Sequence, residues 1–486
     1  MRWKTPAVAL AAGLMLAGCG SSTAKNTGSA GSSSSSGSAA AAVSAGSSAA
    51  AWSGALSPSS PLTVSGLDVI KQVQAQIKQY FGAYPTVSGS TTQGATADSI
   101  TLGIMGDVTA GGKAIFAGVC EGAKARFQRA NDAKELKQKI VIAGCTDTGA
   151  DPSQALSAEN DYALSKKVFG MINTSPLSAQ NADVFTQHHI PYVGWGITPA
   201  FCGKTAPYGF GDSGAGVCDA VSNESSGKYR VSNELMLDAY LRGANKKASD
   251  IKLAVVGDDG ASSKEAVSQE ERNAKLVGAD VVYAGNPVPS NAAATANLQA
   301  SLAPVINAHP TVVYNLTSST TPLIVGLKQA GYTGDFWQNS FTDASALESP
   351  QLAQLLDGEY GVSPGIGSSA FGGSGWATVQ NDAKAIGYTG GLSTGFMHSY
   401  VDADIWVQML KDFQSTGTTL TTENLVNFAN AGWTYQGYSN VSASISFPSG
   451  HYVGTSCAAT VKLDGKNKKV LPAADLSCAP ASVDPS

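Results

Sequence analysis

Hydrophobic residues follow two alternating periodicities between residues 99 and 193. Short runs rich in β-branched and other apolar residues, typical of buried strands, occur at residues 99–104, 140–142, 168–172 and 190–193. The stretches between them, at residues 114–130, 152–165 and 176–188, place apolar residues at helical spacing. A series in which strands and helices alternate predicts a parallel sheet with right-handed crossover connections.

The same alternation resumes after a glycine-rich interruption at residues 198–230. Helix-like stretches now occur at residues 233–242, 262–277, 292–307 and 322–330, and strand-like runs at 251–256, 279–283, 311–314 and 335–337. Two late helices are expected at residues 396–413 and 424–431, followed by short antiparallel strands between residues 444 and 471.

The body from residue 97 to residue 486 is longer than a single domain usually is, so two lobes are expected. We predict an α/β fold of two Rossmann-like lobes, each with a parallel sheet, joined by a multi-strand hinge. The first lobe is expected at about residues 97–230, with later returns near residues 344–356 and 395–431. The second lobe is expected at about residues 231–343 plus part of the remainder.

The N-terminal region differs in character from this body. Two cationic residues, Arg2 and Lys4, precede an apolar run that is too short to span a bilayer and ends in Leu-Ala-Gly-Cys at residues 16–19. This pattern resembles a bacterial lipobox, in which the Cys19 thiol receives a diacylglyceryl group; an ordinary secretory signal with a chance cysteine is the alternative. We predict lipid anchoring at the extracytoplasmic face of the cell membrane.

This interpretation divides the N-terminal region into three parts. A signal peptide is expected at residues 1–18. A Ser/Ala/Gly-rich segment at residues 19–60 is expected to be a flexible tether, because it has too few apolar residues to offset the entropy of ordering. Residues 61–96 are expected to be a docking segment or linker, with a short amphipathic helix at residues 67–81.

Charge and cysteine content narrow the function classes. The formal net charge is only −5 and the basic residues are scattered, which argues against a nucleic-acid surface. With Cys19 assigned to the lipid, six cysteines remain, an even number that favours disulfides in an exported chain. Sequence proximity favours the pairs Cys120–Cys145, Cys202–Cys218 and Cys457–Cys478. A metal site is the rival, but there is no Cys-x-x-Cys and no histidine at ligand spacing from a cysteine pair.

Two motifs suggest enzymes but lack the context that those enzymes need. Residues 209–214 match G-x-G-x-x-G, although no strong strand precedes them and no clear helix follows. The same stretch contains Gly-Asp-Ser-Gly around Ser213, as in some serine proteases, yet His188 and His189 lie too close in sequence and are expected to be a solvated helix end. No catalytic constellation, metal site or cofactor is predicted.

Four short motifs carry a family resemblance across residues 97–431. They are a strand, loop and long helix at residues 104–131, D-x-x-x-D-P-x-x-A at 147–155, a G-x-x-x-S-S-like segment at 170–178 and L-x-Q-A-G at 327–331. In this order they resemble the leucine/isoleucine/valine-binding family of substrate-binding lipoproteins of ABC importers, which have the type I periplasmic-binding-protein fold. The resemblance implies capture of a small polar ligand between two lobes and delivery to ABC permease subunits. A ligand-sensing surface receptor of the same fold, without transport, is the alternative.

The ligand site is expected beyond the carboxyl ends of the strands, where loops lead into helix N-termini. Thr174 and Ser175 are candidates there, although either hydroxyl would also serve as a helix cap. Trp195 is a candidate for stacking on the ligand or for packing between the lobes, and the resemblance implies a ligand-contacting hydroxyl at Thr198. The full candidate set is Asp107, Thr109, Thr174, Ser175, Trp195 and Thr198 in the first lobe and Asp258, Asn315, Phe341 and Asp343 in the second.

One departure from the family pattern concerns the ligand's charge. The resemblance implies an acidic residue after the strand at residues 311–314, where it would pair with the ammonium group of an amino acid. Asn315 stands at the start of this stretch, and residues 315–322 contain no acid. Asp258, Asp259 or Asp343 is a possible substitute. An amide, a short-chain acid or an aromatic acid is therefore as open as an amino acid.

Overall fold

The computed structural model describes residues 82–485, apart from residues 110–112, 150, 175–182, 215–228, 233–234, 260, 277, 290–297, 318–319, 340–341, 453, 456 and 479–481. Cys19, the signal peptide, the tether and the helix predicted at residues 67–81 lie outside this description. Within it, no helix combines the length and the apolar character that crossing a membrane requires.

The first lobe is built on a five-stranded parallel sheet in the order β2-β1-β3-β4-β5. Its strands are β1 (Ser99–Gly106), β2 (Lys139–Asp147), β3 (Gly170–Thr174), β4 (Tyr192–Gly194) and β5 (Gly209–Gly211). All five residues of β3 are buried, as expected of a strand covered on both faces. The alternation of strands and helices at residues 99–193 thus folds as the sequence predicts.

Strand β5 corrects the prediction that residues 198–230 only interrupt the pattern. Its central residue, Phe210, is fully buried and lies opposite Val193 of β4. The two flanking glycines weaken the strand signal in the sequence. Gly209 is needed there, because a Cβ atom at this position would lie 2.7 Å from the ring of Tyr192. Glycine has a low β-propensity, but at this position it allows the strand to pack closely against the Tyr192 ring.

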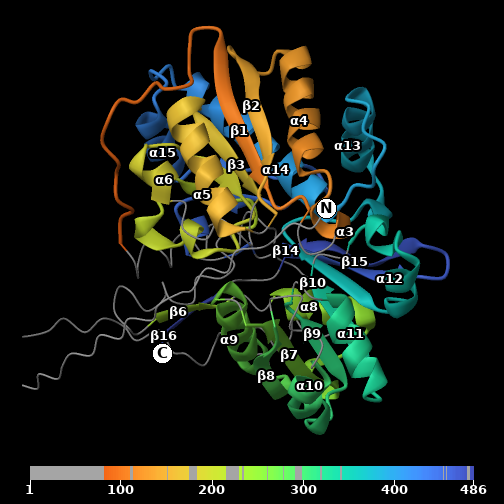
Figure 1. Cartoon of the computed structure of the whole chain (residues 1–486). Helices are drawn as coiled ribbons and strands as arrows, with labels where there is room; N and C mark the ends of the chain where they lie inside the picture. The colour runs from red at the N-terminus through yellow and green to blue at the C-terminus, as the bar shows by residue number, and fades with distance from the viewer. Residues whose placement is uncertain are drawn as a thin grey trace, which may run out of the picture. The chain divides into compact units, whose positions relative to one another are not determined.

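Helices α3 (Lys113–Phe116), α4 (Val119–Ala133), α5 (Pro152–Asn160), α6 (Asp183–Gln187), α13 (Ser374–Ala385), α14 (Thr394–Ser415) and α15 (Thr422–Asn430) belong to this lobe (Figure 1). The single helix predicted at residues 114–130 is broken at Gly118, whose φ of 78° lies in the left-handed region that favours glycine. Asp151 caps α5 by accepting a hydrogen bond from the Ser153 N–H at 2.8 Å. The predicted helix at residues 152–165 continues beyond α5 as one π-helical turn (Asp161–Ser165).

The second lobe is built on a seven-stranded sheet in the order β15-β14-β11-β10-β9-β7-β8. Its strands are β7 (Lys252–Asp258), β8 (Asp280–Val288), β9 (Val312–Asn315), β10 (Asp335–Asn339), β11 (Tyr360–Pro364), β14 (Cys457–Asp464) and β15 (Lys469–Cys478). Strands β7 to β11 are parallel and repeat the order of the first sheet, whereas β14 and β15 form an antiparallel hairpin at the edge. The expected antiparallel tail strands are therefore present.

Helices α8 (Leu235–Ala244), α9 (Ala261–Leu276), α10 (Leu298–Asn307), α11 (Thr320–Gln329) and α12 (Pro350–Leu355) accompany the second sheet. Leu347, Ala353 and Leu356 belong to a hydrophobic core shared with Val313 and Phe336 of this sheet. The segment at residues 344–356, expected to return to the first lobe, therefore packs with the second. Two further strand pairs are β6 (Tyr229–Ser232) with β16 (Ser482–Pro485) and β12 (Thr434–Tyr435) with β13 (Ile445–Ser446).

Residues 84–96, here called the strap, run in extended form along the first lobe (Figure 1). The Thr91 hydroxyl donates to Glu423 at 2.7 Å, and the backbone of Val87 exchanges two hydrogen bonds with the Asn427 side chain. Further contacts join Tyr84 to Gly203 and Gln93 to Ala163 and Val168. These partners all lie in the first lobe, so the strap attaches the chain to that lobe before β1 begins.

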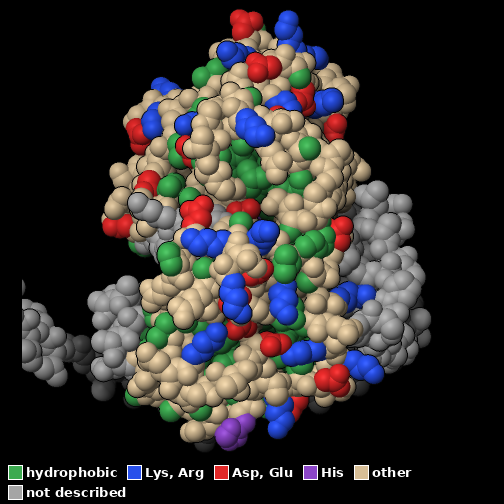
Figure 2. All heavy atoms as spheres, turned by 90° about the vertical axis from the view of Figure 1, so that its right-hand side faces the viewer, with side chains coloured by type: hydrophobic (Ala, Val, Ile, Leu, Met, Phe, Trp, Pro, Cys, Tyr) green, Lys and Arg blue, Asp and Glu red, His purple; other side chains and the backbone are tan. Residues whose placement is uncertain are grey.

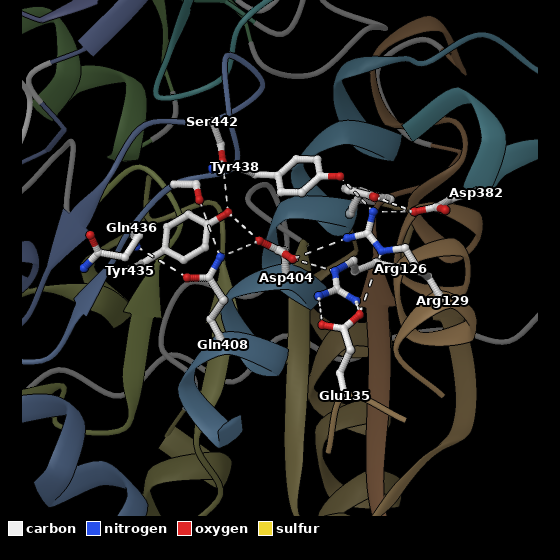
Figure 3. Close-up of polar contacts among 12 residues, drawn as sticks. Arg126, Arg129, Glu135, Asp382, Asp404, Gln408, Tyr435, Gln436, Tyr438 and Ser442 are labelled. Atoms are coloured by element: carbon white, nitrogen blue, oxygen red, sulfur yellow. Dashed lines mark hydrogen bonds and ion pairs between the residues drawn. The ribbon is translucent and has the colours of Figure 1, made fainter. Parts of the chain in front are cut away.

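Figure 3 shows a buried polar network that joins α4 to α13 and α14. Arg126 donates to Asp404 and, through its two terminal nitrogens, to Glu135 at 2.9 Å each. Arg129 pairs with Asp382 at 3.0 Å. The Asp404 side chain is 2% exposed, so its hydrogen-bond partners are protein groups. They include Tyr435 at 2.9 Å and Gln408 at 3.0 Å.

A disulfide joins Cys120 of α4 to Cys145 of β2, with 5.8 Å between the Cα atoms, which is the pair that sequence proximity favours. Cys202 and Cys457 are also disulfide-bonded. The side chains of Cys218 and Cys478 lie outside the described part, so the pairings Cys202–Cys218 and Cys457–Cys478 stay predictions. Cys457 and Cys478 do lie opposite each other in the β14–β15 register.

Lysine and arginine side chains are interspersed with acidic ones over the face drawn in Figure 2. No continuous patch of one sign is visible on this face, in keeping with the formal net charge of −5.

Candidate functional site

Both sheets use a strand order that defines where a ligand binds in open α/β folds. In a sheet of order 2-1-3-4-5 the ligand lies at the carboxyl ends of the first and third strands, where the connections diverge. In the first lobe these are the ends of β1 and β3, and in the second lobe the ends of β7 and β9. The described candidate residues therefore fall at the edge of each sheet where this strand order predicts a ligand.

Asp107 and Thr109 follow β1 but differ in exposure. Asp107 is fully buried and accepts a hydrogen bond from the Thr148 hydroxyl at 2.5 Å. Thr109 is exposed, and its N–H donates to Asp147 at 3.2 Å. Asp107 therefore orders the loop between β1 and α3. Ser175 lies outside the described residues.

Thr174 uses its hydroxyl in a contact with the long helix α14, while the residues that it would cap lie outside the described part of the chain. Its hydroxyl is fully buried and donates to Asp402 of α14 at 3.1 Å. The neighbouring Asn173 is 3% exposed, yet neither its Oδ1 nor its Nδ2 has a hydrogen-bond partner. The hydroxyl of Thr198, 1% exposed, also has none. Each such group costs about 1–3 kcal/mol unless a water or a ligand pairs with it.

An acid–imidazole cluster, which consists of Asp212, His398 and Asp402, lies at the same edge and was not predicted. His398 Nδ1 is 2.5 Å from Asp212 Oδ2, and all three side chains are at most 3% exposed. The Trp195 ring lies against His398 with 4.0 Å between ring centroids. Trp195 also contacts Phe116 edge-on, so it packs within the first lobe at the rim of the cluster.

Strand register explains how these residues meet. Asn173 of β3 pairs with Gly194 of β4, which in turn pairs with Gly211 of β5. Asn173, Trp195 and Asp212 therefore stand at the ends of three adjacent strands. α14 packs against β3 and β4, and it contributes His398 and Asp402 from one helical face.

Burial dominates the protonation of this cluster. It lowers the pKa of His398 to about 3, so the imidazole is neutral at pH 7. Burial also raises the pKa of Asp212 well above its ordinary value, and burial together with the nearby Asp212 carboxyl does the same for Asp402. The proximity of Asp212 thus adds to burial in opposing the ionisation of Asp402.

The edge of the second sheet is polar but uncharged at its centre. Asn315 donates through Nδ2 to Gln338 at 2.7 Å and to Thr320 at 2.9 Å, and its Oδ1 accepts from the Thr317 N–H at 2.8 Å. The Asn315 side chain is thus used by the protein itself. The Gln338 Nε2 is buried without a partner.

The remaining candidates of the second lobe lie around this centre. Asp258 ends β7 and is 7% exposed, and its backbone N–H donates to the Ser263 hydroxyl at 2.9 Å. Asp343 is half-buried and accepts from the Ser369 hydroxyl at 3.4 Å. Phe341 lies outside the described residues.

Two further expectations are settled by contacts. The Ser213 hydroxyl donates to the Pro364 carbonyl at 3.2 Å while His398 pairs with Asp212, so this arrangement does not activate Ser213 as a nucleophile. His189 is not merely a solvated helix end, because its Nδ1 lies 2.6 Å from Glu423. Among the described residues no group of three or more potential ligands is arranged to hold a metal ion.

Comparison with known proteins identifies the family. The model of the periplasmic binding protein family matches residues 99–468. The chain belongs to this family. The match confirms the predicted α/β fold and the resemblance to substrate-binding proteins. Members of the family are extracytoplasmic binding proteins rather than enzymes. No curated protein matches the chain in sequence.

Several solved structures of binding proteins share the fold. A fatty acid ABC transporter substrate-binding protein from Thermomonospora curvata is 16% identical, with a TM-score of 0.61, and the match covers 80% of this chain and 95% of that one. A branched chain amino acid ABC transporter protein from Thermus thermophilus with bound valine is 15% identical (TM-score 0.57; 79% and 98% covered). A solute binding protein from R. palustris in complex with 4-hydroxybenzoate is 12% identical (TM-score 0.57; 79% and 98% covered).

Proposed function

We propose that this periplasmic binding protein captures a small polar solute, such as an amino acid, an amide or a small organic acid, and delivers it to the permease of an ABC importer. The observation that carries the proposal is the set of buried, unpartnered polar groups of Asn173, Thr198 and Gln338 at the carboxyl edges of the two sheets. These edges are where the strand order places a ligand. A ligand with matching donors and acceptors would satisfy groups that the protein leaves unpaired.

A thermal-shift screen of amino acids, amides, amines and small acids tests this proposal. A specific ligand stabilises the folded protein by about 2.7 kcal/mol when its concentration is 100 times its dissociation constant. If several hundred solutes leave the unfolding midpoint unchanged, the binding proposal fails.

The variant Thr198→Val sharpens the test because it replaces an unpartnered hydroxyl with a methyl group of similar size. We expect the unliganded protein to be at least as stable as wild type and the shift by any hit to shrink. Thr146→Val is the matched control, since the Thr146 hydroxyl faces Tyr162 at 3.0 Å. The control should retain the full shift. Equal shifts in both variants would place the ligand elsewhere.

We also propose that Cys19 anchors the protein to the membrane through lipid. The proposal rests on the Leu-Ala-Gly-Cys sequence at residues 16–19 after an apolar run. Cys19→Ala is expected to release a folded protein from the membrane fraction. The anchoring proposal is wrong if this variant stays in the membrane after a high-salt wash.

A further inference from the structure

The unpartnered atoms at the edge of the first sheet are mostly hydrogen-bond acceptors. They comprise Oδ1 of Asn173, Asp212 and Asp402 together with the Thr198 hydroxyl, which both donates and accepts. Only Asn173 Nδ2 and His398 Nε2 are nitrogens. A ligand group that carries several N–H donors can therefore pair with most of this set.

The charge of the acid–imidazole cluster points in the same direction. It contains two carboxyl groups and one imidazole, and none of the interactions described for Asp212, His398 or Asp402 involves a lysine or an arginine. The imidazole is neutral at pH 7 and burial raises the pKa of both carboxyls, so the cluster itself supplies no positive charge. A cation placed against the cluster favours the ionised form of these carboxyls and gains an ion pair, whereas a carboxylate raises their pKa further and finds no cationic partner among them.

The aromatic wall of the cluster suits a cation as well. The Trp195 ring lies at the rim, is 5% exposed and covers His398. Indole faces attract organic cations through their quadrupole, and because His398 occupies one face of this ring, only the opposite face is left for a cation. At the end of β9 the second sheet offers the neutral Asn315 amide, which is bound to Gln338 and Thr320, and its nearest candidate acid is Asp258 at the end of β7.

From these observations we infer that the ligand's head group is an organic cation rich in N–H donors, an amine or an amidine, bound against Asp212, His398 and Asp402 next to Trp195. This inference rests on the proposed solute-binding function and names the chemical class of its ligand. In this arrangement the cationic head group contacts the first lobe, and the rest of the solute faces the second lobe.

Three probes of nearly equal shape test the inference: benzamidine, benzamide and benzoate differ mainly in a head group that is cationic, neutral or anionic at pH 7.5. Their dissociation constants are measured by calorimetry on the full body of the protein. We expect benzamidine to bind at least 10-fold more tightly than benzoate, with benzamide between them. Benzoate binding as tightly as benzamidine overturns the inference.

Variants of the cluster separate charge from shape. Asp212→Asn or Asp402→Asn alone leaves one carboxyl that can ionise against a cation and should retain a preference for benzamidine. The double variant leaves no carboxyl in the cluster and is expected to reduce the benzamidine-to-benzoate ratio at least 10-fold. The matched control is the double variant Asp98→Asn and Asp161→Asn, which removes two exposed acids of the same lobe. An equal change of ratio in this control overturns the assignment to the cluster.

If none of the three probes binds, the thermal-shift screen described above tests the inference separately from the binding function. Hits enriched in amines and amidines then support the inference. Hits dominated by carboxylates overturn it while the binding function stands. A screen without any hit overturns both the binding function and the inference that rests on it.

Discussion

Replacing Glu159 with glutamine is expected to stabilise the protein above pH 7 and to have little effect below pH 4. Glu159 lies in α5 with a side chain that is 4% exposed. Burial, with a smaller contribution from Asp183, raises its pKa from 4.5 to about 7. The folded state therefore binds this proton more tightly than the unfolded chain does, and the stability it confers is lost as the pH rises from 4.5 through 7.

The magnitude follows from the two pKa values. The difference between 4.5 and about 7 corresponds to roughly 3 kcal/mol of stability lost between pH 4 and pH 8. Glutamine has the shape of the protonated acid and does not ionise, so the variant should not show this loss. For a lobe of about 200 residues, 1 kcal/mol moves the melting temperature by roughly 2–4 °C.

Melting temperatures of wild type and Glu159→Gln, measured from pH 4 to pH 8.5, test this reasoning. The two curves should coincide near pH 4 and diverge with a midpoint between pH 5 and 7. Glu348→Gln, which removes an exposed carboxylate, is the control and should run parallel to wild type. A constant difference between Glu159→Gln and wild type at every pH would refute the idea that this carboxyl is buried and protonated.

Asp404→Asn is expected to cost about 3–5 kcal/mol in urea unfolding, because it leaves the buried Arg126 guanidinium without one of its anionic partners; a cost below 1 kcal/mol would contradict the role assigned to the network. Replacing both Cys120 and Cys145 with serine should lower the free energy of unfolding by about 3 kcal/mol, because the unfolded chain is no longer restricted by a cross-link between residues 25 positions apart. Peptide mapping without reductant must recover this pair. Glu423→Gln should increase amide hydrogen exchange across the strap at least tenfold, and unchanged exchange would show that the Glu423–Thr91 contact does not hold it.

The layered α/β architecture was predictable because each long element carries its own periodic signal. Strands β1, β7 and β9 are apolar runs, and the apolar residues of α4 and α14 recur at helical spacing. Elements with weak local signals were missed. Strand β5 has a single large residue between two glycines, and α13 buries Trp376, Val379 and Ala383 in an otherwise polar sequence.

The candidate site was predictable only in part, because strand ends can be located from sequence whereas tertiary neighbours cannot. Thr174, Trp195 and Thr198 lie at the carboxyl edge of the first sheet as the sequence implied. His398 and Asp212 are 186 residues apart, and only the packing of α14 on the sheet brings them together. One signal was available: His398 and Asp402 are four residues apart in a predicted apolar helix, where buried polar residues need a partner.

The strap gives the two lobes unequal mechanical roles. Its hydrogen bonds join the chain preceding β1 to the first lobe, so tension applied from the N-terminal side enters the protein there. Were Cys19 anchored as proposed above, the first lobe would be the one held near the membrane, and rotation about a hinge between the lobes would move the second lobe relative to it. A permease that recognises the closed state would then have one surface presented in a constant pose and another whose position reports ligand occupancy.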